Sequence, residues 1–313
     1  MSRAGESRLS RPEALSIGGM RSLRPLSRPA DELLDARELA PEVVLGRLGG
    51  ENFPVALRWL PRALRSDLIA IYGAARLIDE AGDAARGDRL ALLDAVEEDV
   101  RAAFAGAARH PLLRRLTPLG AAHGITADPF VRLVAANRFD QRAPDLASFS
   151  ELRDYCALSA QPVGELVLRV FDQASDANRR DSDEVCTALQ VLEHCQDVAE
   201  DANAGRCYLP RDDRARFACT PRDLVAAPAP EALRRCVALQ VERARELLAH
   251  GAALCGRLRG LARPVIAGYV AGGLATAAAL ERAQFDPNRV PVRPRRRTTL
   301  RHALRLWALG ARA

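Results

Sequence analysis

Acidic side chains recur at intervals of four residues in two separate parts of the chain. Glu193, Asp197 and Asp201 form one set, and Asp79 and Asp83, more than a hundred residues earlier, form the other. In an α-helix this spacing returns a side chain to nearly the same face, about 6 Å further along the axis. Each set therefore predicts a helix that carries its carboxylates on one side.

Carboxylates on a shared face repel one another, so a bound cation would offset a cost in helix stability. Magnesium suits this role because it prefers hard oxygen ligands and commonly binds through one or two carboxylates together with a substrate phosphate. Two such faces opposed across a cavity would hold a diphosphate through more than one magnesium ion, with these predicted ligands: Asp79, Asp83, Glu193, Asp197 and Asp201. The alternative is that both sets are solvated helix faces in a chain of which 27% is charged.

The elements that must position these ligands are two helices, predicted over residues 65–85 and 181–201. In each helix, apolar residues border the acidic stripe: Leu64, Leu68, Ile71, Ala75 and Ile78 in the first, and Val185, Ala188, Leu189, Leu192 and Ala199 in the second. Tyr72 and Arg76 share the acidic stripe of the first helix. Because both stripes adjoin an apolar arc, the carboxylates would edge a buried side, which favours a site over solvated faces.

The composition predicts an all-helical fold, since the chain is rich in Ala and Leu, only 4% aromatic, and shows no strand pattern. We expect a disordered Arg-, Ser- and Pro-rich lead (1–30), one all-helical domain around a central cavity (31–288), and a basic C-terminal arm (289–313). Within the domain, residues 148–175 predict a helix pair or a kinked helix, and residues 206–228 a loop. Residues 264–280 predict a buried helix, since this apolar run falls short of the ~20 residues that span a bilayer.

The net charge of +6 is concentrated at the two ends of the chain. Residues 1–30 hold six Arg against two Glu, and residues 289–313 hold eight Arg and no acidic residue, which leaves the centre acidic. This distribution argues against nucleic acid as a partner and suits either peripheral contact with an anionic membrane or a solvated arm. The sequence contains no Lys, which excludes Schiff-base chemistry. Seven cysteines without a CxxC pair predict a cytoplasmic protein, either free or at the inner face of the cell membrane.

The two acidic stretches resemble the motifs of the squalene/phytoene synthase family, which are head-to-head prenyl synthases. The family's first motif, Tyr-x3-Arg-x2-Asp-x3-Asp, is met by Tyr72, Arg76, Asp79 and Asp83. The second motif is Asp-x3-Asp followed by Gly-Arg-x-Tyr-Leu-Pro, and it is met by Asp197, Asp201, Gly205, Arg206, Tyr208, Leu209 and Pro210. The resemblance covers residues 52 to 305 approximately and implies an all-α, single-domain isoprenoid-synthase helical bundle.

The resemblance also implies roles for individual residues. The aspartates would bind magnesium and the diphosphate, and they would act in catalysis together with Tyr72 and Arg76. Further substrate contacts are expected from Asn52, Phe53, Arg65, Gln196, Tyr208 and Arg289.

Within the family, the chain is most similar to hydroxysqualene synthases of bacterial hopanoid pathways. The likeness rests on three segments: Glu51–Val55, Gln196–Val198 and Val270–Ala275. It implies that presqualene diphosphate is ionised, that the cation rearranges, and that water captures it, with functional coupling to other hopanoid-pathway enzymes. Capture by water needs no NADPH, and the sequence shows no GxGxxG motif after a strand.

Five positions depart from the expected pattern. Residues 145 and 146 are Asp and Leu where hydroxysqualene synthases tend to show Arg-Tyr, and residue 161 is Gln where Asn is usual. Residue 80 is Glu where a second Asp is usual, and residue 193 is Glu where Asn is usual. Two alternatives therefore stay open. One is another head-to-head synthase, making presqualene diphosphate, squalene or phytoene, and the other is a non-catalytic isoprenoid-binding homologue that would bind its ligand without magnesium-dependent release of diphosphate.

Overall fold

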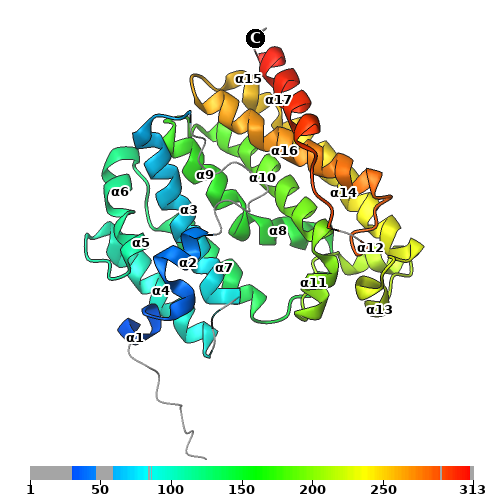
Figure 1. Cartoon of the computed structure of the whole chain (residues 1–313), viewed down its shortest axis with the longest axis horizontal. Helices are drawn as coiled ribbons and strands as arrows, with labels where there is room; N and C mark the ends of the chain where they lie inside the picture. Colours follow the sequence, from blue (N-terminus) through cyan, green and yellow to red (C-terminus); the bar gives the residue numbers. More distant parts are fainter. Residues whose placement is uncertain (1–29, 47–58, 84, 86, 290, 311–313) are drawn as a thin grey trace, which may run out of the picture.

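The computed structural model describes residues 30–46, 59–83, 85, 87–289 and 291–310 (Figure 1). Across these residues the structure is helical, without strands, and its only β-type pairing is an isolated bridge between Asp145 and Cys207. The predicted all-α fold is confirmed. Asn52, Phe53 and the predicted lead up to residue 29 lie outside the described residues.

The described residues form a series of helices along the chain. In order, they are α1 Ala30–Leu34, the 3-10 helix η1 Arg37–Leu39, α2 Pro41–Gly46, α3 Arg62–Asp83, α4 Arg89–Phe104, α5 Pro111–Arg114, α6 Thr117–His123, α7 Asp128–Asp140, α8 Phe149–Ser159, α9 Gln161–Val170, α10 Asp176–Gln196, α11 Val198–Asn203, α12 Arg211–Arg216, α13 Pro221–Val225, α14 Glu231–Gly251, α15 Ala253–Arg257, α16 Ala262–Arg282 and α17 Arg296–Gly310.

Two groups of helices frame the centre of the molecule. In Figure 1, α3 to α7 lie on one side and α10, α14, α16 and α17 on the other, with α8 and α9 between them. Helix α3 packs against α4, α7 and α9, and α10 packs against α9, α14 and α16. The two helices that carry acidic stripes therefore reach the centre from opposite sides.

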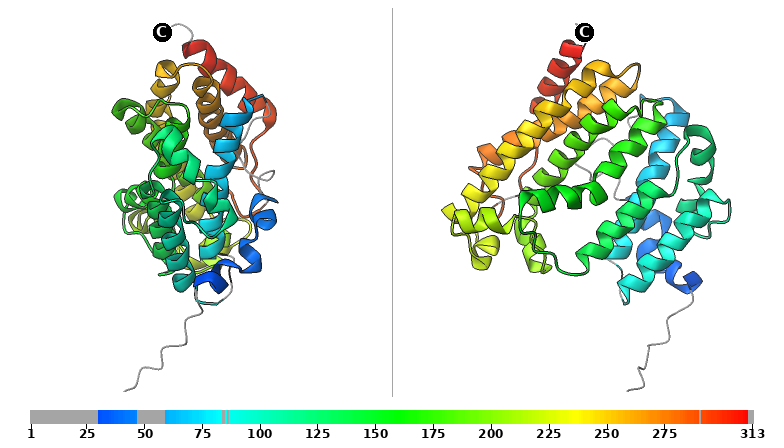
Figure 2. Two further views of the ribbon diagram at one scale, coloured as in Figure 1. Left: turned by 90° about the vertical axis from the view of Figure 1, so that its left-hand side faces the viewer. Right: turned by 180° about the vertical axis from the view of Figure 1, so that it is seen from behind.

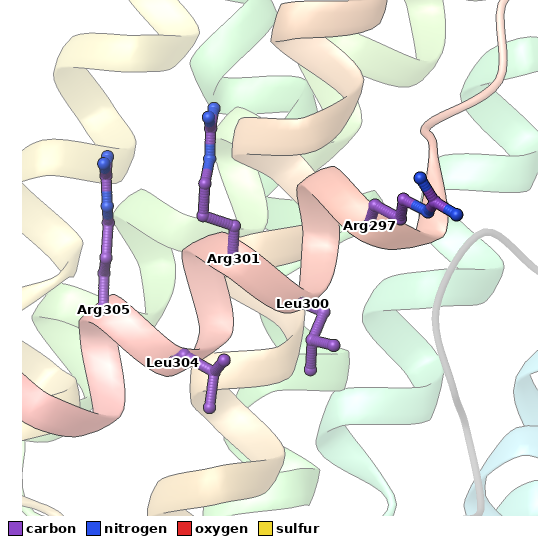
Figure 3. Close-up of a pocket in the computed structure, with 5 residues that line it drawn as sticks. All are labelled: Arg297, Leu300, Arg301, Leu304 and Arg305. Carbon is purple, nitrogen blue, oxygen red and sulfur yellow. The ribbon is translucent and has the colours of Figure 1, made fainter.

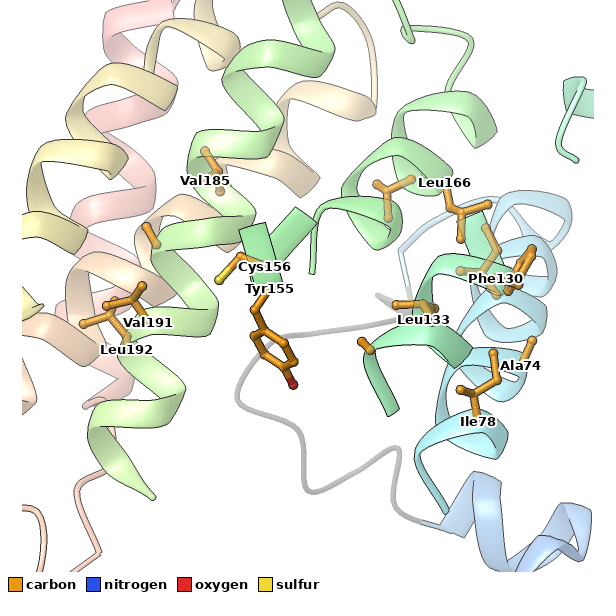
Figure 4. Packing of buried hydrophobic residues seen from close by; sticks show 14 of the residues in the cluster. Ala74, Ile78, Phe130, Leu133, Tyr155, Cys156, Leu166, Val185, Val191 and Leu192 are labelled. Atoms are coloured by element: carbon orange, nitrogen blue, oxygen red, sulfur yellow. The ribbon is translucent and has the colours of Figure 1, made fainter. Parts of the chain in front are cut away.

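The apolar arc predicted for α3 is its packing face. Leu68, Ile71 and Ile78 are buried, at intervals of three to seven residues that keep them on one side of the helix. Figure 4 shows Ile78 on α3 together with Leu133 of α7, which packs beside it. One hydrophobic cluster extends from residue 34 to residue 306, so these helices share a single core.

The second acidic helix differs from its prediction at both ends. It begins at residue 176, because the Ser175 side chain accepts a hydrogen bond from the Asn178 backbone and caps the helix there. It ends at Gln196, since Asp197 leaves the helical conformation with φ −105° and ψ 18°. Backbone bonds from residue 197 to the Glu193 carbonyl (3.0 Å) and from Asp201 to the residue 197 carbonyl (2.8 Å) span the break.

Two other predictions are refined by the helix boundaries. Residues 148–175 form the helix pair α8 and α9, and Pro162 lies in the first turn of α9, where a missing backbone N–H costs nothing. The predicted loop at 206–228 contains the short helices α12 and α13.

The C-terminal helices pack together along one edge of the molecule. Helix α17, within the predicted basic arm, lies along α16 and also contacts α15 (Figure 2). In the described part of the chain, α16 alone is long and apolar enough to cross a membrane, yet 67% of its most apolar window is buried inside the protein. Helix α16 therefore has the buried character predicted for residues 264–280.

Candidate functional site

A polar cavity of about 410 Å³ lies between the two acidic helices. It is lined by all five predicted ligands: Asp79, Asp83, Glu193, Asp197 and Asp201. The structure thus brings the two acidic sets to one space, as their spacing and apolar borders predict. Arg76 also lines this cavity.

Arg206 bridges the two acidic sets across the cavity. Its Nη1 lies 2.6 Å from Asp83 Oδ1, and its Nη2 lies 3.6 Å from Asp201 Oδ1. The Nε of Arg206 is buried and has no hydrogen-bond partner. The Arg206 guanidinium therefore offsets the charge of the facing carboxylates. The sequence analysis placed Arg206 in the second motif and assigned it no role.

Asp79 is positioned by a neighbouring helix. Asn137 of α7 donates from Nδ2 to Asp79 Oδ1 at 3.2 Å and to the Leu133 carbonyl at 3.2 Å. This approach requires glycine at position 82, because a Cβ there would lie 2.1 Å from Asn137 Oδ1. Gln141 donates to the carbonyl of Gly82 at 3.0 Å and holds the end of α3 against α7.

Glu80, which stands where the family usually has Asp, is paired with another side chain in the structure. Glu80 is 2% exposed, and its Oε1 accepts hydrogen bonds from Arg76 Nε at 3.1 Å and Nη2 at 2.9 Å. A buried carboxylate usually needs such a partner, and a two-point contact fixes the plane of the guanidinium. Glu80 therefore orients Arg76 at the cavity.

Three aromatic side chains that line the polar cavity contact one another: Tyr155, His194 and Tyr208. The hydroxyls of Tyr208 and Tyr155 donate to the two carboxylate oxygens of Asp140 at 2.6 and 2.9 Å. His194 stacks on Tyr208 with ring centroids 3.8 Å apart, and its Nδ1 lies 3.6 Å from Asp201 Oδ2. Burial raises the pKa of Asp140 to about 6, although both tyrosine hydrogen bonds lower it.

The donor atoms of the cavity fit magnesium in kind. They are hard carboxylate oxygens, and burial together with repulsion from Asp201 and Glu200 raises the pKa of Asp197 to about 6, as expected where a cation would relieve the repulsion. Among the residues that the structure describes, no three carboxylate, imidazole or thiol groups converge to form a complete metal site.

A second, mainly apolar cavity of about 280 Å³ continues from the first. Helices α3, α9, α10, α15 and α16 supply its walls, including Leu68, Ile71, Val167, Leu189 and Ile266. From Asp79 to Leu68 the lining residues follow α3 for eleven residues, about 16 Å at 1.5 Å per residue. The acidic mouth therefore leads into an elongated apolar space.

The residues predicted to contact substrate fall into two groups. Tyr72 lines the apolar cavity and Tyr208 the polar one. Arg65, Gln196 and Arg289 line neither cavity, and the Gln196 side chain instead donates to the Val292 carbonyl at 2.5 Å.

The sequence interpretation missed several residues that the structure places at the polar cavity: Asn137, Asp140, Tyr155 and His194. Three of them lie on α7 and α8, outside both acidic motifs, so no spacing links them to the site. His194 adjoins Glu193 on α10, and its contacts with Tyr208 and Asp201 show that it faces inward.

Comparison with known proteins places these features in a family. Residues 47–301 match the family model described as squalene/phytoene synthase. The chain is similar to a hydroxysqualene synthase from Zymomonas mobilis, with 32% identity over 63% of this chain and 67% of the relative. It is also similar to a phytoene synthase from Arthrospira platensis, with 29% identity over 72% of this chain and 77% of the relative.

Solved structures agree with this assignment. The crystal structure of squalene synthase HpnC from Alicyclobacillus acidocaldarius is 40% identical and superposes with a TM-score of 0.71, covering 83% of this chain and 100% of that one. A dehydrosqualene synthase in complex with a ligand is 19% identical with a TM-score of 0.76, over 88% and 97% of the two chains, and so shares the fold. The chain belongs to the squalene/phytoene synthase family and has its all-α isoprenoid-synthase fold.

Proposed function

We propose that this protein converts presqualene diphosphate to hydroxysqualene by ionising the diphosphate, rearranging the cation and capturing it with water. One observation carries the proposal: the cavity that holds both acidic sets opens into an elongated apolar cavity. A prenyl diphosphate has a charged end and an apolar body, which match the polar and the apolar cavity.

The diphosphate would lie in the polar cavity. Its ligands toward magnesium would be the carboxylates of Asp79, Asp83, Glu193, Asp197 and Asp201, and more than one ion could be held. Magnesium, when bound, neutralises charge that develops on the leaving group. The guanidinium groups of Arg76 and Arg206 can donate to the same phosphate oxygens, as fixed donors do at sites of developing charge.

The hydrocarbon would occupy the apolar cavity, whose walls exclude bulk water from the cation. Tyr72 lines this cavity on α3, one turn before Arg76, and offers an aromatic ring that can stabilise positive charge.

The choice of product rests on the relatives. Both the Zymomonas protein and a second relative from Sinorhizobium fredii, 30% identical, are named hydroxysqualene synthase. The reaction consumes water and no reductant, so NADPH is not required by the proposal. Other relatives are named phytoene synthase and presqualene diphosphate synthase. The second candidate function is therefore one of these two head-to-head reactions.

We further propose a cytoplasmic protein that contacts an anionic membrane through α17. Leu300 and Leu304 are 60% and 56% exposed, and they share a shallow surface depression with Arg297, Arg301 and Arg305 (Figure 3). In Figure 3 the leucines and Arg301 and Arg305 extend from different sides of α17. An amphipathic helix of this kind can place apolar side chains at the hydrocarbon boundary and arginines at the phosphate groups of anionic lipids. Membrane contact would also bring an apolar product to the enzymes of a hopanoid pathway that use it.

Product analysis tests the enzymatic proposal. The purified protein is incubated with magnesium and either presqualene diphosphate or farnesyl diphosphate, without NADPH, and the extract is examined by mass spectrometry. We expect hydroxysqualene from presqualene diphosphate. Consumption of farnesyl diphosphate without that product would favour the second candidate, and binding without any reaction would indicate a non-catalytic homologue.

A further inference from the structure

Five residues line both the polar and the apolar cavity: Arg76, Asp79, Ser159, Gln190 and Glu193. They mark the junction at which a diphosphate group would meet its hydrocarbon body. The bond that breaks on ionisation joins these two parts, so the cation forms beside this junction.

Ser159 has an unusual environment among these residues. Its Oγ is buried and has no hydrogen-bond partner. It is the last residue of α8, just before Ala160 leaves the helical conformation with φ −121° and ψ −45°. Buried hydroxyls are nearly always paired with protein or water, so an unpaired one at a cavity wall indicates a position for water or ligand.

Gln190 offers a second neutral polar group at the same junction. Its Nε2 faces His194 Nε2 at 3.3 Å, which leaves the amide oxygen available as an acceptor. Two of the three charged residues at the junction are engaged in the structure, since Arg76 pairs with Glu80 and Asp79 accepts from Asn137.

We infer that Ser159, together with Gln190, holds the water molecule that captures the cation and so selects an alcohol as the product. This inference rests on the proposed function and deepens it. If the Ser159 and Gln190 oxygens accept the two water protons, a lone pair of the water is left to face the cation.

The step is balanced without a further reactant. The carbon–oxygen bond to the diphosphate breaks, and its electron pair leaves with the diphosphate. After rearrangement, the water oxygen forms the new carbon–oxygen bond, and the proton that it loses passes to the released diphosphate. Without a held water, the same cation loses a proton to the diphosphate and yields a hydrocarbon.

The test compares products of the full-length wild type, Ser159→Ala and Ser159→Thr with presqualene diphosphate and magnesium. The removal of one hydrogen bond to water should lower the ratio of alcohol to hydrocarbon about fivefold in Ser159→Ala. Diphosphate release precedes water capture, so in Ser159→Ala it should fall less than alcohol formation does. Ser159→Thr, which keeps the hydroxyl, should restore the ratio. Ser66→Ala, an exposed serine of α3, is the matched control and should match the wild type.

An unchanged alcohol ratio in Ser159→Ala would overturn this inference, as would an equal loss of diphosphate release and alcohol, which indicates a structural role. If the wild type itself forms no alcohol from presqualene diphosphate, the proposed function fails and this inference with it. If the wild type makes the alcohol and Ser159→Ala makes it in the same ratio, the role of Ser159 is refuted and the proposed function stands.

Discussion

Replacing Gly82 by alanine should disrupt the site even though alanine favours helices. Gly82 lies in the last turn of α3, and a Cβ at this position would lie 2.1 Å from Asn137 Oδ1 and 2.9 Å from its Cγ. No side chain tolerates such distances, so the Asn137 amide must move. That movement breaks its 3.2 Å bond to Asp79.

The change in the free energy of unfolding is the balance of one favourable and two unfavourable contributions. Alanine in place of glycine would stabilise a helix by up to about 1 kcal/mol. Overpacking costs about 1–3 kcal/mol, and the lost hydrogen bond to a charged carboxylate costs about 1.5–3 kcal/mol. We therefore expect Gly82→Ala to lower the free energy of unfolding by about 2–5 kcal/mol and to slow diphosphate release.

Chemical denaturation and a diphosphate assay measure both effects. Gly268→Ala is the matched control, because Gly268 lies inside α16 with nothing within 4 Å of an added Cβ, and it should be neutral or stabilising. In the double variant Gly82→Ala/Asn137→Ala the contacts with Oδ1 and Cγ are gone and only the 3.1 Å contact with the residue 137 Cβ remains, so its cost should be smaller than the sum of the two single costs. A Gly82→Ala protein as stable and active as Gly268→Ala would refute this reasoning.

Three further predictions concern other parts of the molecule. Arg206→Gln removes the cation between the two acidic sets and should lower kcat/KM for diphosphate release about tenfold or more in steady-state assays, and unchanged kinetics would contradict the proposed role. Burial raises the pKa of Asp183 to about 6 from its ordinary 3.8, so the native state binds more protons and the free energy of unfolding should fall as pH rises from about 4 to about 6. Denaturation across that range should show a smaller fall for Asp183→Asn than for the wild type, because Asp140 and Asp197, whose pKa values are also raised to about 6, keep their own contributions; an equal fall in both proteins would contradict this assignment. Replacing both Leu300 and Leu304 by serine should weaken sedimentation with phosphatidylglycerol vesicles while activity in solution stays unchanged, and undiminished sedimentation would exclude α17 as the contact.

Local periodicity explains what could be predicted from the sequence. The acidic stripe and the apolar arc of α3 repeat every three or four residues, so the side that the helix buries follows from spacing alone. The same reasoning placed Asp79 and Asp83 at a cavity edge. It could not place Gln196, because the helix ends at that residue and its side chain turns to Val292, which is 96 positions away.

Contacts between distant segments explain what could not be predicted. Arg206 and Asp83 are 123 residues apart, and neither a repeat nor a spacing connects them. Asn137 belongs to α7, which has no acidic motif, and its closeness to α3 depends on the missing side chain of Gly82. The glycine beside Asp83 was the available signal, since glycine in a helix often marks a close approach.

The central claim is that the two acidic sets act together to ionise a prenyl diphosphate. The most direct test measures released diphosphate and hydroxysqualene together, from presqualene diphosphate and magnesium without NADPH, for the wild type, Asp79→Ala and Asp197→Ala. We predict one diphosphate per alcohol in the wild type and loss of both in each variant, with folding checked by circular dichroism. Diphosphate release that persists in either folded variant would contradict the account.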